Sequence, residues 1–562
     1  MKRNTYSKLR RILVIVVLRE GISEIKARLK EYFDSRRSCA DDLGSVTHIF
    51  SEFANYVKVP NPKSHNLILL DDFPIYRWAV PNLLLAHKIA SETNSKVAVF
   101  SFREPSKSTT VLYKNLFVDE LIVIRLSILQ KLELYREYRH LLKYLNDGES
   151  LIDYTIQGIP IGLDIYESIL RSGYPTIDIQ SQKTFRIAYL GLKQFVFFRA
   201  FFKQKRIKSI LVSHDNYVGP GILSHMAFYY GVEVILANLI SMTIPERDFQ
   251  LYEKFRRYKI YSKHLDEREL KNGIEWAKSQ LSLRISGSLG VGITYQEKSA
   301  FDDATVARQT TWNNLTKVLV LTHDFFDNPH GYARMFFDDF LSWMFFLASI
   351  SVETNYEWYI KPHRDYSEKE LEVLKSFISE NDKFHMIDPE TSFHQLRSEG
   401  IDFALTCHGT VGHELPLLGY TVINASYNPH IAFDFNVSAK SKAEYEHILR
   451  HIDDFRISEI NTEEIYVFYY IHHKVVQDDE FLGISFEALD KISQGSFNSN
   501  AELEYLLNNV DVIAERVVKH LNAMRTTGRV YSFEEFLPDQ IQLKRKNQLF
   551  GDESERIHAK YQ

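Results

Sequence analysis

The chain has 562 residues, and its 68 Lys and Arg against 73 Asp and Glu leave a formal net charge of −5. This balance argues against a protein built mainly to hold nucleic acid, because neutralising phosphate requires a basic excess. Hydrophobic residues make up 45% and charged residues 25%, which excludes a disordered chain, collagen or a coiled coil. The length fits two large α/β domains or about three or four smaller ones.

Short apolar runs alternate with helical stretches, a pattern typical of parallel-sheet α/β domains. The first run, 12–18, follows a basic start, but Arg19 comes directly after it without a small-residue cleavage site, so it predicts a buried strand rather than a signal peptide. Further strands are predicted at 67–70, 96–100, 120–124, 210–212 and 232–237, with helices at 22–32, 80–92, 128–144, 165–171 and 185–204. Residues 1–300 therefore form one Rossmann-like unit with a helical insertion.

A polar stretch at about 267–314 predicts a domain linker, and the glycines between Gly287 and Gly292 belong to it rather than to a phosphate loop. A second Rossmann-like unit follows at 310–475, with strands predicted at 317–321, 358–360, 384–387, 403–406 and 421–423 and helices at 335–349, 368–380 and 412–418. Residues 476–562 form a helical extension, with an amphipathic helix at 499–523 and a polar tail from 544. Two such units are expected to face each other across a cleft, with strand carboxyl ends on both sides.

The stretch 403–423 is the most informative part of the second unit. A strand runs through the turn His408-Gly409-Thr410-Val411-Gly412 into a helix, whose first N–H groups and the Thr410 hydroxyl suit an anion. Gly409 and Gly412 would allow a phosphate to approach closely, and Glu414 is placed to reach ribose hydroxyls. The alternative is an ordinary strand–turn–helix in which Gly and Thr serve as caps.

Other strand ends of the second unit also carry polar groups. Lys361 and His363 follow an apolar strand and suit a phosphate, although a solvated surface turn is the alternative. Asp388 and Ser392 follow the next strand, where they would read a nucleotide base or, equally well, cap a helix. At the entry to the unit, four residues favour hydrogen bonding in the cleft over a metal site: His323, Asp324, Asp327 and His330.

The first unit offers carboxylates at its own strand ends. His214 and Asp215 follow the strand 210–212, and Asp215 would act as a general base or as a nucleophile at a sugar carbon. A helix-capping role is the alternative for Asp215. Asp71 and Asp72, after the strand 67–70, are rival carboxylates, and we include Asp72 with His214 and Asp215 among the catalytic candidates.

Aromatic residues make up 13% of the chain, and most are assigned to the core. Those beside the cleft motifs would contact a sugar: Tyr217, Phe325, Phe326 and Tyr427. The segment 195–206 combines phenylalanines with basic residues, and a buried helix is favoured there over peripheral contact with the inner membrane face. Two cysteines far apart, Cys39 and Cys407, indicate a reducing cytoplasm.

Several of these motifs together resemble bacterial capsule-type surface-polysaccharide glycosyltransferases of the GT-B fold, a group that includes Kdo transferases using CMP-sugars. The resemblance extends over residues 150–435 and is carried by the segments 158–171, 322–330, 361–363, and 408–414 with 428–430. It implies that His363 and Thr410 bind the nucleotide phosphate, with Asn428 and His430 lining the cleft. Two positions depart from the pattern, because Arg364 stands where Pro is usual and His408-Gly409 where Ser is often seen.

The resemblance implies an α/β, GT-B-like enzyme that moves a sugar, such as Kdo or another nonulosonic-type acid, from a CMP-linked donor to a polysaccharide or glycolipid acceptor. It implies no metal and no cofactor besides the nucleotide-sugar. Alternatives are a CDP-glycerol- or ribitol-type polyol-phosphate transferase, a sugar-nucleotide epimerase, and a non-catalytic binding protein of polysaccharide assembly.

Overall fold

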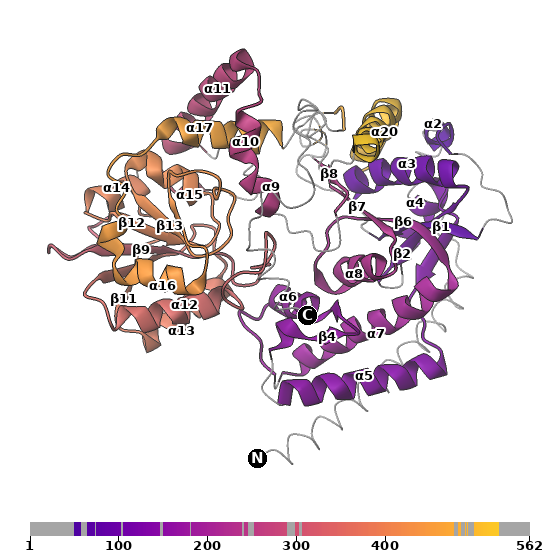
Figure 1. Ribbon diagram of the computed structural model, residues 1–562, viewed down its shortest axis with the longest axis horizontal. Helices are drawn as coiled ribbons and strands as arrows, with labels where there is room; N and C mark the ends of the chain where they lie inside the picture. The colour runs from indigo at the N-terminus through magenta and orange to yellow at the C-terminus, as the bar shows by residue number, and fades with distance from the viewer. Residues whose placement is uncertain are drawn as a thin grey trace.

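The structure is a computed structural model (Figure 1), and it describes residues 50–57, 65–72, 75–102, 105–146, 150–179, 181–238, 241–245, 252–288, 298–302, 306–476, 482–484, 489, 492 and 499–527. The strand expected at 12–18, the helix at 22–32 and the polar tail from 544 lie outside these ranges. Most of the stretch from Gly287 to Gly292 also lies outside them.

The N-terminal domain is built on a six-stranded sheet with the order β3-β2-β1-β6-β7-β8. Its strands are β1 (Asn66–Asp71), β2 (Lys96–Ser101), β3 (Glu120–Val123), β6 (Arg206–Val212), β7 (Glu233–Ala237) and β8 (Met242–Thr243). All pairs are parallel except β7 with β8. The strand order reverses between β1 and β6, which is the point where ligands bind in sheets of this type.

Helices cover both sides of this sheet. One hydrophobic core lies under α5 (Ile128–Asn146), α6 (Gly162–Arg171), α7 (Gln182–Gln204) and α8 (Ile222–Tyr229). The other lies under α3 (Tyr76–Thr93) and α4 (Lys107–Asn115), beside the short α2 (Phe50–Ala54). A hairpin of β4 (Thr155–Ile156) and β5 (Ile159–Pro160) precedes α6. Phe195, Phe198 and Phe202 of α7 are buried in the first core, so the favoured prediction of a buried helix at 195–206 is confirmed.

The C-terminal domain repeats the same strand order, β11-β10-β9-β12-β13-β14, with every pair parallel. Its strands are β9 (Lys317–Leu321), β10 (Glu357–Lys361), β11 (Phe384–Met386), β12 (Phe403–Thr406), β13 (Thr421–Asn424) and β14 (Val437–Ser438). Its helices are α12 (Phe340–Ser351), α13 (Glu368–Glu380), α14 (Phe393–Ser398), α15 (Val411–Glu414), α16 (Lys442–Arg450) and α17 (Thr462–Tyr470). The predicted GT-B-like fold with two Rossmann-like domains is therefore confirmed.

The stretch predicted to be a polar linker contains a long helix instead. After α9 (Tyr252–Arg256) and α10 (Tyr258–Ser262), α11 runs from Glu267 to Ile285, capped by the Asp266 side chain, and packs along α17. Its buried residues recur at helical spacing: Gly273, Ala277, Leu281 and Arg284. Gly273 and Ala277 are small and Arg284 is charged, so Leu281 is the one large apolar side chain among the four. The helical periodicity of the buried positions is therefore hard to recognise in this polar sequence.

Two other predicted helices differ from the structure at their ends. The helix expected at 335–349 starts only at Phe340, because Asp339 caps it by accepting a hydrogen bond from Ser342 N at 2.6 Å. The single helix expected at 499–523 is divided at Asn509 into α19 (Asn500–Asn508) and α20 (Val510–Thr527). Both of these helices pack against α3, so the end of the chain completes the core of the N-terminal domain.

The two domains contact each other through α6 and the preceding segment (Figure 1). The Tyr166 hydroxyl donates to the Asp339 carboxylate at 2.5 Å, and Arg334 pairs with Asp153 at 2.7 Å. Lys369 also reaches the Gly173 carbonyl. None of the helices in the described ranges combines the length and hydrophobicity that a bilayer crossing requires.

A buried ion pair fastens the C-terminal helices to the N-terminal domain, and it predicts a stability effect. Arg77 and Glu502 are 4% and 0% exposed, and Nε lies 2.7 Å from Oε1. Arg77→Ala leaves the Glu502 carboxylate buried without this cation, so we expect a loss of about 3–5 kcal/mol in the free energy of unfolding, measured in urea. The double variant Arg77→Met/Glu502→Leu is the control and should recover most of it. Equal losses in both variants would contradict this account.

Candidate active site

Histidines follow the three central strands of the C-terminal sheet at the same distance. β9, β10 and β12 are neighbours, and His323, His363 and His408 each lie two residues beyond the last residue of one of them. Because parallel strands end at the same edge of a sheet, the three imidazoles come to one edge. His214 holds the equivalent position after β6 of the N-terminal sheet.

His323 and His408 form the centre of this edge. Their ring centroids are 4.4 Å apart, and His323 stacks on Phe340. His323 Nε2 accepts the backbone N–H of His408 at 3.3 Å and lies 3.1 Å from the Thr406 hydroxyl, so its proton sits on Nδ1. Burial lowers the pKa of His323 well below its ordinary value and that of His408 to about 4. Both imidazoles are therefore neutral hydrogen-bonding groups at pH 7.

The turn after β12 agrees in part with its prediction. Thr410 is exposed, and its hydroxyl makes no capping hydrogen bond to the helix that follows. A Cβ on Gly412 would lie 2.4 Å from the His430 ring, so a glycine is needed there for packing. The helix expected at 412–418 is wrong in extent, since α15 ends at Glu414 and continues as a 3₁₀ turn that contains Pro416. So short a helix adds little dipole to an anion site.

The prediction that Glu414 reaches ribose hydroxyls is wrong. Its carboxylate accepts a hydrogen bond from Arg284 Nε at 2.9 Å, and the residues are 1% and 3% exposed. Arg284 comes from α11, so this buried pair fixes α11 to the turn after β12. The charge of Arg284 also contributes to lowering the pKa of His363, after burial as the main cause.

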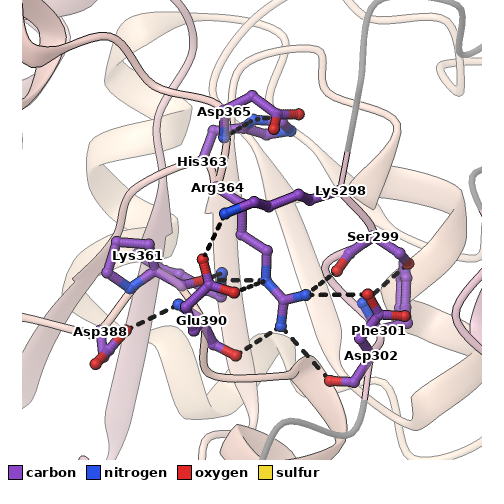
Figure 2. Close-up of polar contacts among 11 residues, drawn as sticks. Lys298, Ser299, Phe301, Asp302, Lys361, His363, Arg364, Asp365, Asp388 and Glu390 are labelled. Carbon is purple, nitrogen blue, oxygen red and sulfur yellow. Dashed lines mark hydrogen bonds and ion pairs between the residues drawn. The ribbon is translucent and has the colours of Figure 1, made fainter.

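Arg364 joins the segment at Ser299 to the loop 388–390, and Lys361 bonds to the same loop (Figure 2). Lys361 is 3% exposed and donates to the Pro389 carbonyl at 2.8 Å, and burial lowers its pKa to about 7. Arg364 donates to the same carbonyl at 3.2 Å, to the Glu390 carbonyl at 2.6 Å, and to the carbonyl of Ser299. His363 lies beside this cluster, where its Nδ1 accepts the Asp365 N–H at 3.1 Å. Lys361 is thus tied to the protein rather than pointing freely at a phosphate.

Other predicted site residues stabilise local turns. Ser392 caps α14, which is the alternative named for it, and Asp388 and Asp324 accept backbone N–H groups two residues ahead. His330 is used within its own loop, with Nδ1 accepting from Met335 N and Nε2 donating to the Asp338 carbonyl. Asn428 is fully buried and accepts the His430 N–H at 2.9 Å.

His430 belongs to a second histidine cluster behind the turn. Its Nε2 lies 3.0 Å from His413 Nδ1, and the ring of His413 is 5.9 Å from that of His473. Burial lowers the pKa of His430 to about 3 and that of His473 to about 4. We therefore assign His430 to packing under Gly412 rather than to the lining of the domain interface.

In the N-terminal domain, a hydrogen-bonded chain crosses the point where the strand order reverses. Asp71 ends β1 and is 2% exposed, and its Oδ2 accepts from the Ser213 hydroxyl at 2.8 Å. That hydroxyl lies 2.6 Å from His214 Nδ1. Burial raises the pKa of Asp71 to about 7 and lowers that of His214 to about 4. Asp71, Ser213 and His214 thus form a hydrogen-bonded chain in which Asp71 is the group with a pKa near neutral pH.

The two other predicted carboxylates differ in their surroundings. Asp72 is held by the Ser101 hydroxyl at 2.5 Å and the Tyr113 hydroxyl at 2.9 Å. Asp215 is half-buried, and burial raises its pKa. The segment after it is strained, because Tyr217 adopts a φ of 68°, a left-handed conformation that is rare for a tyrosine. Asp72 is therefore tied to two hydroxyl groups, whereas Asp215 lies beside a strained segment.

Two carboxylates on α6 were missed as site residues by the sequence analysis. Asp164 and Glu167 are each 1% exposed, and burial followed by a neighbouring carboxylate raises the pKa of both. The neighbour that acts most on Glu167 is Asp215. With Arg171 these residues have the spacing i, i+3 and i+7 on one side of an otherwise apolar helix. This spacing of charged residues along one side of a helix could have identified Asp164 and Glu167 from the sequence.

Asp327 connects the two domains at this site. Its Oδ1 lies 3.4 Å from Arg171 Nη1 of α6, and the Tyr217 hydroxyl donates to it at 3.4 Å. The charge of Asp327 also acts on Glu167 and His408. The site therefore includes groups from both sheets. Among residues within the described ranges, no group of three His, Cys, Asp or Glu could hold a metal ion.

The sequence shows no significant match to a protein-family model or to a curated protein. Solved structures with similar folds include KpsC of Thermosulfurimonas dismutans, a beta Kdo 2,4 transferase, at 12% identity and a TM-score of 0.27 over 47% of this chain and 79% of that one. MnaA of S. aureus with UDP shares 12% identity, with a TM-score of 0.21 over 81% and 97%. The wall teichoic acid polymerase TagF shares 9% identity, with a TM-score of 0.19 over 84% and 94%. Similarity at this level does not identify an activity.

The raised pKa of Asp71 predicts a pH-dependent stability. A carboxyl whose pKa rises on folding stabilises the fold at low pH, and this contribution is lost as the pH rises through the folded value of about 7. Between about pH 5.5 and about pH 8, Asp71 should therefore lower the free energy of unfolding by about 2 kcal/mol. Asp71→Asn should remove this part of the difference between the free energies of unfolding that urea titrations give at the two pH values. An unchanged difference would show that the Asp71 carboxyl does not titrate in this range.

Proposed function

We propose that this protein is a glycosyltransferase that moves a sugar from a nucleotide-activated, CMP-linked donor to a surface-polysaccharide or glycolipid acceptor. In this proposal the C-terminal domain binds the donor and the N-terminal domain binds the acceptor. The sugar is Kdo or another nonulosonic-type acid, as the resemblance of the sequence motifs suggests. The buried free thiol of Cys407 supports a reducing, cytoplasmic setting.

One observation supports this proposal above the others: polar groups from both Rossmann-like domains meet around Asp327. Arg171 and Tyr217 contact it from the N-terminal domain. Within the C-terminal domain, the charge of Asp327 acts to raise the pKa of His408, whose ring lies against that of His323. A reaction that joins two substrates, one on each domain, needs this kind of shared site.

The donor phosphate is assigned to the edge formed by His363, His408 and Thr410. Neutral imidazoles and an exposed hydroxyl can donate hydrogen bonds to a phosphate oxygen as negative charge develops on it. Lys361 stays bound to the Pro389 carbonyl, and its charge acts on the neighbouring His363. The proposal uses no resident metal ion and no cofactor other than the nucleotide-sugar.

The transfer step is assigned to Asp215. The acceptor hydroxyl oxygen bonds to the anomeric carbon, the bond from that carbon to the phosphate oxygen breaks, and the nucleoside monophosphate leaves with the electron pair. Asp215 takes the hydroxyl proton if it acts as a base, which inverts the configuration. If its carboxylate first bonds to the carbon and is then displaced, the configuration is retained. The anomeric configuration of the product distinguishes the two roles.

Nucleotide binding provides the first test of the donor site. His363→Ala and Thr410→Ala should each weaken the binding of CMP by roughly tenfold, since each removes a hydrogen bond to a charged phosphate. Isothermal titration with CMP, CDP, UDP and GDP measures the affinities. His385→Ala, an exposed histidine on β11, is the matched control and should bind as the wild type does. Unchanged affinity in both site variants would remove the proposed phosphate site.

The catalytic assignment is tested separately from donor binding. Asp215→Asn should keep its CMP affinity and lose transfer by roughly 10²–10⁴-fold, the usual contribution of a general base. Release of CMP from CMP-Kdo in the presence of acceptor is the measurement, and Asp72→Asn is run beside it. An active Asp215→Asn with an inactive Asp72→Asn would move the role to Asp72. Turnover of CDP-glycerol instead of CMP-sugars would favour a polyol-phosphate transferase.

A further inference from the structure

Helix α5 has an outer side that no other described element covers. Its inner side packs into the first hydrophobic core through Leu134, Tyr138, Leu141, Leu142 and Leu145. On its outer side, Ile128 is 80% exposed, Leu129 78% and Leu132 63%, and Tyr135 follows at 39%. These four residues form an apolar stripe over the first two turns of the helix, which we call the α5 stripe. Single exposed apolar residues are ordinary in soluble proteins, whereas a contiguous stripe marks a contact surface.

The exposed Lys and Arg residues of α5 outnumber its acidic residues, none of which is exposed. The exposed residues of α5 outside the stripe are Lys131, Arg136, Arg139, His140 and Lys143. The two acidic residues of the helix lie away from this side: Glu133 is paired with Arg199 of α7, and Glu137 is buried and bonded to Arg136 at 2.8 Å. The outer side of α5 is therefore basic in a protein whose net charge is −5.

Basic residues also lie beyond the other end of the stripe. Two contacts show that α7 runs antiparallel to α5: Glu133 with Arg199, and Tyr138 with Tyr189 at a ring distance of 6.1 Å. The C-terminal end of α7 therefore lies near the start of α5. It brings exposed Lys203 and Arg206 to that end. The apolar stripe is thus flanked by cations at both ends.

We propose that the α5 stripe docks on an anionic lipid surface, with its apolar side chains entering the headgroup boundary and the flanking cations contacting lipid phosphates. An amphipathic helix with an apolar strip and a basic polar side has the composition of an interfacial membrane helix. The excess of exposed Lys and Arg on α5 favours an anionic lipid over a second copy of this chain, whose net charge is small. α5 lies at the outer border of the N-terminal domain (Figure 1).

This inference does not depend on the proposed chemistry, and it corrects the location of the lipid contact considered from the sequence. The phenylalanines of 195–206 mostly face the core, and the exposed apolar surface belongs to α5 instead. A glycolipid acceptor, if the proposed function holds, would then be presented on the side of the acceptor domain.

Co-sedimentation of the full chain with vesicles tests the proposal. Vesicles of phosphatidylcholine with phosphatidylglycerol should bind the wild type, and vesicles of phosphatidylcholine alone should bind it at least about tenfold more weakly. Leu129→Ser/Leu132→Ser should lower binding to the anionic vesicles by at least about tenfold, because two apolar side chains leave the headgroup boundary. Arg139→Gln/Lys143→Gln should lower it by roughly fivefold for each charge removed.

The matched control is Leu283→Ser/Val352→Ser, which removes two exposed apolar side chains, 51% and 70% exposed, from other helices. It should bind vesicles as the wild type does. The proposal is overturned if the wild type does not distinguish anionic from neutral vesicles. It is also overturned if Leu129→Ser/Leu132→Ser binds like the wild type, since contact would then be electrostatic and not made through the stripe.

Discussion

The alignment of parallel strands is the constraint on which the site depends. In each sheet the central strands end at one edge, so any polar residue placed just beyond a strand arrives beside those of its neighbours. His323, His363 and His408 reach one edge of the C-terminal sheet in this way, and Asp71 and His214 reach that of the N-terminal sheet. The chain thereby brings together polar groups that are more than a hundred residues apart, as Asp71 and Ser213 are, without any special motif.

Burial then decides the charge of these groups. Burial keeps the imidazoles neutral at pH 7 by lowering their pKa. It raises the pKa of the Asp71 carboxyl to about 7 and lowers that of Lys361 to about 7. These buried groups therefore carry few fixed charges of their own. The strong ion pair of the region, Arg284 with Glu414, is structural and joins α11 to the turn after β12.

The strands that were predicted most closely from the sequence are buried at every position. β9 and β12 match the predicted ranges, whereas α11 was missed because glycine, alanine and arginine stand at its buried positions. The site was predicted less well. Glu414 and Ser392 were predicted to contact the nucleotide. In the structure the Glu414 carboxylate pairs with Arg284 of α11, and the Ser392 hydroxyl caps α14. Such partners come from tertiary packing, which spacing along the chain does not reveal.

The return of α19 and α20 to α3 has a consequence for the order of events during synthesis. Leu503, Leu506 and Leu521 fill the same core as β1 and β2, although several hundred residues separate them in the chain. Glu502 must also arrive before the buried guanidinium of Arg77 has this partner. The N-terminal domain is translated first, yet α3 stays without the helices that pack on it until residues 500–527 leave the ribosome. The C-terminal domain, whose sheet is completed within residues 317–438, can finish folding earlier.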